Sequence, residues 1–312
     1  MVVLGSAWDA ASWTSRSGTH TSRAEVVALA TRLKQRVDRA AELGAELANE
    51  IQEWSRSGPT MRTFIADDCL SWEVQVEAVD PPFDAWGRRF GDALHNLRAA
   101  LDNLTWGLAS LGGSVPKRPT RIQFPIAAER SDWLQESRRI DQLPQHAQRA
   151  IEAVQPFQRL LEDIDPTTDG LLLLHRLNVI DKHRLALQPE VQPEELSHAF
   201  AVDFGSDENA ALNVPPDVTL SIDVFVSGTT ILRHVTKTPI HRVEGEWTIK
   251  SRVVVLDEWG RAHGVTTLLA GLMQYVPVVM DFVLAAAFDA PADEWHPKCP
   301  DNLRLLAVRL PE

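Results

Sequence analysis

Hydrophobic residues recur at helical spacing in several long stretches of the chain. One predicted helix runs from Ser22 to Ser57 and stops at the Gly58-Pro59 pair, and a second runs from Asp84 to Leu111 and stops at a pair of glycines. Further helices are predicted at Ser131–Arg139, Pro144–Val154 and Leu171–His183, and from Val265 onward.

Alternating apolar and polar positions, rich in β-branched residues, predict strands between these helices. Two such segments, Arg62–Ala66 and Ser71–Val79, follow the first helix. After Pro189 the character of the chain changes, and strand-like runs follow one another as HAFAVDF, VTLSIDVFV, TTILRHV and EWTIKSRVVVLDEW. Because the strands do not alternate regularly with helices, we expect an α+β fold in which a helical bundle packs against an antiparallel sheet.

The same pattern predicts one domain preceded by a flexible arm. Residues 1–20 lack helical or strand periodicity and are expected to form that N-terminal arm. Residues 21–312 are expected to form a single α+β domain, helix-rich over 21–188, strand-rich over 196–260 and closed by a C-terminal helix at 264–289.

Composition and charge narrow the functional classes. The chain has 312 residues, of which 44% are hydrophobic, and a formal net charge of −12, which argues against a chain-wide basic surface for DNA or anionic lipid. Two cysteines are too few for a disulfide framework, and the N-terminus lacks a secretion signal, so a cytoplasmic location is expected. The apolar stretch Val265–Phe288 is interrupted by Gln274, Pro277 and Asp281, so we predict a packed soluble helix and no membrane contact.

The predicted Asp84–Leu111 helix carries a charged strip beside its core-facing side. On an ideal helix His95 and Asp102 differ by only about 20°, and Arg98 lies about 60° from His95. This strip borders an apolar stripe, so its charges must find partners at the edge of the core. The stripe consists of Phe90, Leu94, Leu97, Leu101, Leu104, Leu108 and Leu111.

The predicted Leu171–His183 helix is apolar on more than one side, which is typical of an element in the middle of a bundle. Arg176 and His183 differ by about 20° around its axis, and the other polar residues form a neighbouring strip. If this helix packs on the one that carries His95, the two sets of polar side chains meet. The polar residues of the second helix are His175, Arg176, Asn178, Asp181 and His183.

Several chemical interpretations of this polar cluster stay open. Arg98 and Asp102, at i and i+4, can form an ion pair, hydrogen-bonded to His95, that only stabilises the bundle. Arg98 and Arg176 can instead receive a small anion, as in a ligand-binding or regulatory protein. The histidines and aspartates can also hold a divalent metal for a hydrolase, although no HExxH or ExxH spacing is present.

A further interpretation is a nuclease. Arg176 and His183, with six residues between them, resemble the Arg-x4–6-His motif of the HEPN helical-bundle ribonucleases. The resemblance implies metal-independent RNA cleavage, with His183 as general acid or base and Arg176 holding the phosphate.

Four sequence strings extend the resemblances to a second family. GDALHNLRAALDNLTW (91–106), FPI (124–126), AVQPF (153–157) and LNVIDKHR (177–184) are similar to segments of a family of uncharacterised bacterial proteins. The similarity covers about residues 71–185. It implies no reaction, and it supports the choice of the two helices as the site.

Taken together, these patterns predict a ligand-binding or regulatory module. The alternatives are a HEPN-like ribonuclease and a metal-dependent hydrolase. Whether the protein is an enzyme is left open. The expected partner is a small or anionic ligand, RNA and a homodimer are left open, and no cofactor or metal ligand is assigned. His234, His241 and His263 are expected at the surface or in hairpins because no metal-ligating residue falls at suitable spacing. The candidate catalytic residues are Arg176 and His183, and the candidate binding residues are His95, Arg98, Asp102, His175, Asn178 and Asp181.

Overall fold

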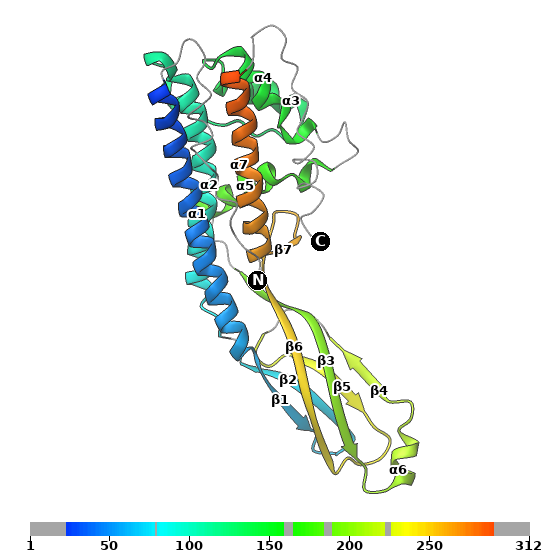
Figure 1. Ribbon diagram of the computed structural model, residues 1–312. Helices are drawn as coiled ribbons and strands as arrows, with labels where there is room; N and C mark the ends of the chain where they lie inside the picture. Colours follow the sequence, from blue (N-terminus) through cyan, green and yellow to red (C-terminus); the bar gives the residue numbers. More distant parts are fainter. Residues whose placement is uncertain (1–22, 79, 159–164, 184–188, 222–225, 290–312) are drawn as a thin grey trace. The chain divides into compact units, whose positions relative to one another are not determined.

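The protein divides into two compact units, each assembled from separate stretches of chain. A computed structural model describes residues 23–78, 80–158, 165–183, 189–221 and 226–289 (Figure 1). Among the described residues, the helical unit comprises those within 23–47, 84–183 and 256–289, and the strand unit comprises those within 48–83 and 189–255. The expected N-terminal arm, residues 1–20, lies outside the described residues.

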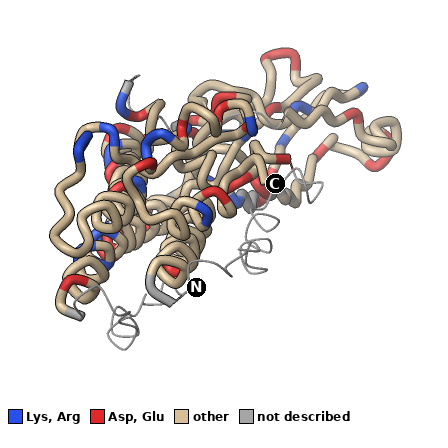
Figure 2. Tube along the Cα trace, turned by 90° about the horizontal axis from the view of Figure 1, so that it is seen from above, with Lys and Arg blue, Asp and Glu red and all other residues tan. Residues whose placement is uncertain are grey.

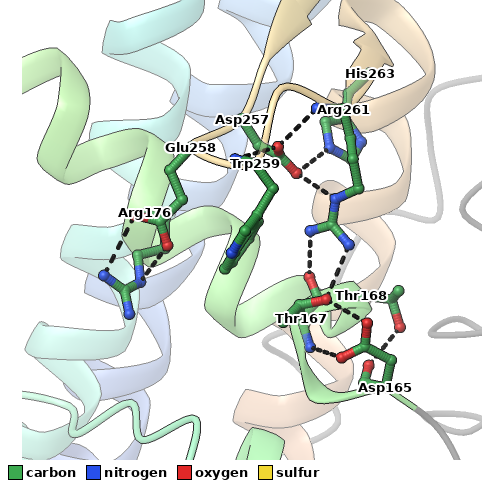
Figure 3. A network of polar contacts seen from close by, with 9 residues as sticks. All are labelled: Asp165, Thr167, Thr168, Arg176, Asp257, Glu258, Trp259, Arg261 and His263. Atoms are coloured by element: carbon green, nitrogen blue, oxygen red, sulfur yellow. Dashed lines mark hydrogen bonds and ion pairs between the residues drawn. The ribbon is translucent and has the colours of Figure 1, made fainter.

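The helical unit is a bundle of long helices with shorter ones between them. The long helices run side by side in Figure 1, and 3-10 turns, among them η4 (Ser137–Arg139) and η6 (Pro166–Thr168), connect the shorter elements. The helices are α1 (Arg23–Ser57), whose last residues enter the strand unit, α2 (Phe83–Ala109), α3 (Arg130–Glu136), α4 (Gln145–Ala153), α5 (Gly170–His183) and α7 (Val265–Asp289).

The core of the bundle lies where the sequence pattern placed it. Six residues of the α2 stripe are at most 2% exposed, whereas Leu111 lies beyond the end of α2 and is half-buried. Small residues allow the helices to approach closely: Gly107 of α2 faces Leu29 of α1, and Gly44 of α1 faces Met273 of α7. The six stripe residues are Phe90, Leu94, Leu97, Leu101, Leu104 and Leu108.

The strands form two sheets. A four-stranded sheet has the order β1-β2-β5-β4, in which Val74 of β2 pairs with Leu232 of β5. A long ladder joins β3 to β6, with Val191 opposite Val253. The strands are β1 (Thr60–Ile65), β2 (Ser71–Ala78), β3 (Glu190–Asp203), β4 (Asp217–Leu220), β5 (Thr230–Val235) and β6 (Arg242–Leu256); the short β7 (Ala262–Gly264) precedes α7.

The expected α+β class is confirmed, with helices and antiparallel sheets in one chain. The short helix α6 (Asp207–Leu212) was not predicted, because its few residues carry no helical periodicity; its N-cap is Ser206, whose hydroxyl accepts from the Asn209 backbone N–H.

Helix α7 combines strong hydrophobicity with burial. Its segment Val265–Ala287 is long and apolar enough to cross a membrane, and 56% of its most apolar window is buried within the protein. Core helices of soluble proteins share these properties. Pro277 lies inside the helix without ending it.

Candidate functional site

The polar strip of α2 holds a neighbouring segment of backbone. Arg98 Nη2 lies 2.9 Å from Asp102 Oδ1, so the expected ion pair is present, and it also donates to the Phe124 carbonyl at 2.5 Å. Asp102 Oδ1 accepts in turn from the Phe124 N–H at 2.9 Å. Both backbone groups of Phe124 are therefore bound by one side-chain pair. Burial lowers the pKa of Arg98 below its ordinary value, against the opposing effect of Asp102.

Gln155 binds the same segment from the other side. It is fully buried, donates from Nε2 to the Pro125 carbonyl at 3.0 Å and accepts the Ala127 N–H at 3.0 Å. Polar side chains of two of the strings that carry the family resemblance thus bind the backbone of one short stretch, residues 124–127, which includes a third string, FPI. This contact set is structural, because it satisfies buried backbone groups that would otherwise be costly.

Helices α2 and α5 face one another at their polar strips. Asp181 of α5 lies so close to Gly91 of α2 that a Cβ on that glycine would stand 2.6 Å from the Asp181 Cγ. One turn earlier on α5, Asn178 is only 5% exposed, and its Oδ1 is buried without a hydrogen-bond partner among the described residues.

His175 lies at the centre of a positively charged environment. Burial and the charges of Arg98, Arg176, Arg139 and Lys182 lower the pKa of His175 to about 4, so the imidazole is neutral near pH 7. Its Nδ1 is buried and has no hydrogen-bond partner in the described part of the chain. Arg98 Nη1, like this nitrogen and Asn178 Oδ1, is also buried without a hydrogen-bond partner among the described residues.

Two adjoining cavities open beside His175. The smaller, about 200 Å³, is lined by Ile126, Asp132, Gln135, Glu136, Arg139 and His175. The larger, about 360 Å³, is lined by Thr120, Arg121, Gln123, Gln135, Glu136, Arg138 and Arg139. Because they share the side chains of Gln135, Glu136 and Arg139, we treat them as one cleft, called here the arginine cleft.

The charges of the arginine cleft are unequal. Glu136 is engaged by Arg139, whose Nε lies 2.8 Å from Glu136 Oε2 and which also contacts the Gln123 side chain. The side chains of Arg121 and Arg138 make no hydrogen bond or ion pair within the described ranges. The larger cavity is therefore lined by three guanidinium groups and one carboxylate. Elsewhere along the helices, acidic and basic residues are mixed (Figure 2).

The remaining predicted site residues are dispersed. His95 is exposed on α2, and no contact joins it to Arg98 or Asp102 among the described side chains. Arg176 pairs with Glu258, Nε to Oε1 at 3.3 Å. His183 is the last residue of α5, but its side chain lies outside the described residues. The nuclease interpretation, which needs Arg176 and His183 together, stays a prediction.

A second polar network, which the sequence analysis missed, surrounds Asp257 (Figure 3). The Asp257 carboxylate has no solvent exposure. Its Oδ1 accepts the backbone N–H groups of Trp259 and Arg261 at 2.9 Å each. Its Oδ2 accepts Arg261 Nε at 2.7 Å and lies 2.9 Å from His263 Nε2. Burial alone would raise the pKa of Asp257, but the hydrogen bonds from His263, Arg261 and the backbone bring it below its ordinary value.

The Asp257 network ties a hairpin loop to the start of α5. Arg261 donates from Nη1 to the Thr167 hydroxyl and from Nη2 to the Thr167 carbonyl, both at 2.9 Å, and Asp165 caps the same turn. His263 lies in β7, the second strand of the hairpin, and its side chain is only 15% exposed because it packs on Asp257. Every oxygen of that carboxylate is satisfied, so the network is structural. The sequence signal was an Asp with Gly, Arg and His three, four and six residues later.

Of the two positions expected for His234, at the surface or in a hairpin, the surface position is wrong. In the strand unit His234 is 7% exposed, and its Nδ1 accepts the Trp72 indole N–H at 2.9 Å. The ring fills a gap opposite Trp72, its cross-strand partner, which the one-dimensional pattern could not indicate.

Metal binding finds little geometric support. No group of three or more His, Cys, Asp or Glu side chains in the described residues is arranged to hold a metal ion.

Comparison of the chain with protein-family models, with curated proteins and with solved structures gave no match in any of the three. The site must therefore be interpreted from its own geometry.

Proposed function

We propose that the protein is a ligand-binding module and that the arginine cleft receives a small anion. The proposal rests chiefly on one observation: the guanidinium groups of Arg121 and Arg138 have no partner in the described part of the chain, and these residues line a cavity of about 360 Å³ together with Arg139. Guanidinium groups bind carboxylate and phosphate oxygens in a planar, two-bond geometry, and pockets of a few hundred Å³ hold small molecules.

The surroundings of the cleft also favour an anion. Burial is the main cause that lowers the pKa of His175 to about 4, and the positive charges of Arg98, Arg176, Arg139 and Lys182 lower it further. The contribution of these four cations means that the ring lies in a positive electrostatic potential, which attracts an anion. Such an excess of positive charge stands out in a chain whose formal net charge is −12.

This proposal reassigns the anion contact predicted from the sequence. Arg98 is occupied by Asp102 and the Phe124 carbonyl, and Arg176 by Glu258. The direct contacts to the anion are therefore assigned to Arg121, Arg138 and Arg139. Arg98 does not contact the anion and contributes only through its positive charge.

Isothermal titration calorimetry with sodium sulfate, at constant ionic strength against chloride, tests the proposal. We expect saturable binding that weakens about tenfold in Arg121→Gln and in Arg138→Gln, since each removes a charge-assisted contact. Arg149→Gln is the matched control, because Arg149 is an exposed arginine on α4 outside the cleft. No saturable binding, or equal loss in the control, would overturn the proposal.

A further inference from the structure

His175 is a titratable residue at the edge of the arginine cleft. It lines the smaller cavity, and that cavity shares Arg139 with the arginine-rich one. Of the two ring nitrogens, Nδ1 is a fully buried atom, and the residue lines the smaller cavity. An ion bound by Arg139, the arginine that both cavities share, would lie next to the space that borders the imidazole.

The charged groups around His175 come from every element packed on it. Arg98 approaches from α2, Arg139 from η4, and Arg176 and Lys182 from α5 itself. Asp132 and Glu136 of α3 also line the cavity, and Glu136 is paired with Arg139. The four cations oppose protonation of the ring, and without a ligand the pKa of His175 is about 4.

We propose that His175 takes up a proton from solvent when an anion enters the arginine cleft, so that anion binding and protonation of this residue strengthen each other. The inference rests on the proposed function and adds its regulation. Since the imidazole has one bare nitrogen, the incoming proton binds there, and the second N–H becomes a further donor. By linkage, an anion that raises the pKa of His175 by one unit binds about tenfold more tightly to the protonated than to the neutral form.

Sulfate is the suitable probe because it remains a dianion over the whole working range of pH. We expect the His175 ring resonances, followed by NMR, to titrate about one pH unit higher in saturating sulfate than without it. Correspondingly, the sulfate dissociation constant should fall roughly threefold between about pH 7 and pH 4.5 on account of this residue.

His175→Gln separates this effect from the titration of Asp132 and Glu136. The variant keeps both carboxylates and all cleft arginines, so any tightening that remains at low pH comes from groups other than His175. The proposal requires the wild type to tighten roughly threefold more than the variant over that range. Equal tightening in the two proteins, or a His175 titration unmoved by sulfate, would overturn the proton link while leaving anion binding intact. Failure of sulfate to bind at every pH would instead remove the proposed function itself.

Discussion

Asp181 of α5 lies directly against Gly91 of α2, with both of its carboxylate oxygens within 2.7 Å of the position that a Cβ on Gly91 would take. Gly91 occupies the strip of α2 that also carries Arg98 and Asp102. The contact therefore brings the polar strips of the two helices together, and it requires a residue without a side chain at this point.

Replacing Gly91 by alanine should destabilise the protein, although alanine is normally the better helix former. The new methyl group must displace a short carboxylate held on the neighbouring helix, and overpacking of this kind costs about 1 to 3 kcal/mol. That cost exceeds the roughly 1 kcal/mol gained in helix propensity. Urea unfolding measures the net change.

Gly44→Ala is the matched control, because the atom nearest to its added Cβ is the terminal methyl of Met273. A methionine side chain can move aside cheaply, so this variant should unfold close to the wild-type midpoint. If Gly91→Ala proved as stable as Gly44→Ala, the close approach of Asp181 would be contradicted.

Removal of the Asp102 carboxylate should be far more harmful than loss of an ordinary helical ion pair. Asp102→Ala leaves Arg98, 7% exposed, without its counter-charge and frees the Phe124 N–H. Breaking a buried pair in this way costs about 3 kcal/mol or more in the free energy of unfolding. Denaturant titration at neutral pH gives the value directly.

The α1 pair Lys34–Asp38 has the same i,i+4 spacing with an N–O distance of 2.6 Å, but its side chains are 35% and 46% exposed. Asp38→Ala should therefore cost no more than about 0.5 kcal/mol. Similar losses in the two variants would mean that the Phe124 contacts contribute nothing.

The sequence alone was sufficient to predict the helices other than α6, the core face of α2 and the Arg98–Asp102 pair, because each depends on neighbours within one or two turns. The leucine stripe of α2 is buried as its periodicity requires. The same periodicity put His95 on the polar strip, yet that side chain is exposed. The angular position of a residue on one helix does not determine whether a neighbouring helix covers that residue.

The functional part of the site could not be predicted in this way. Arg121 lies in a short 3-10 turn and Arg138 and Arg139 lie in η4, and no local sequence pattern predicts that the three line one cavity. Likewise, Gln155 and Phe124 are far apart in sequence, so only the three-dimensional structure reveals that one segment is bound from both sides. Long-range placement of irregular segments leaves no local signal.

His175 should make the protein less stable in acid. Its pKa is about 4 in the native state, below the ordinary value of 6.5 that applies when the chain unfolds. Both states are neutral above that ordinary value, and as the pH falls the unfolded chain binds the proton first. The unfolding free energy therefore decreases between about pH 6.5 and pH 4, by up to about 3 kcal/mol.

Urea titrations at a series of pH values, in buffers without sulfate or phosphate, reveal this dependence. His175→Gln should flatten the curve over that interval, whatever its effect on stability at neutral pH. His95→Gln replaces an exposed histidine and should keep the wild-type slope. A wild-type slope in His175→Gln would show that other groups cause the acid sensitivity.

Asp257 should be the most sensitive position of the hairpin that precedes α7. Alanine there leaves two backbone N–H groups, Arg261 and His263 without their common acceptor, and the expected loss is about 3 to 5 kcal/mol in urea unfolding. Asp257→Asn keeps the shape and one acceptor oxygen, so it should lose less and remain folded for comparison. Because the pKa of Asp257 lies below its ordinary value, the stability that its carboxylate contributes is complete at neutral pH and disappears only as the pH falls through that lowered pKa.

Glu258→Ala is the control: it removes the neighbouring ion pair with Arg176, whose partners are 27% and 42% exposed, and should cost less than about 1 kcal/mol. Since the two acidic residues are adjacent in sequence, a loss in Asp257→Ala no greater than in Glu258→Ala would show that the four contacts to this carboxylate do not stabilise the loop.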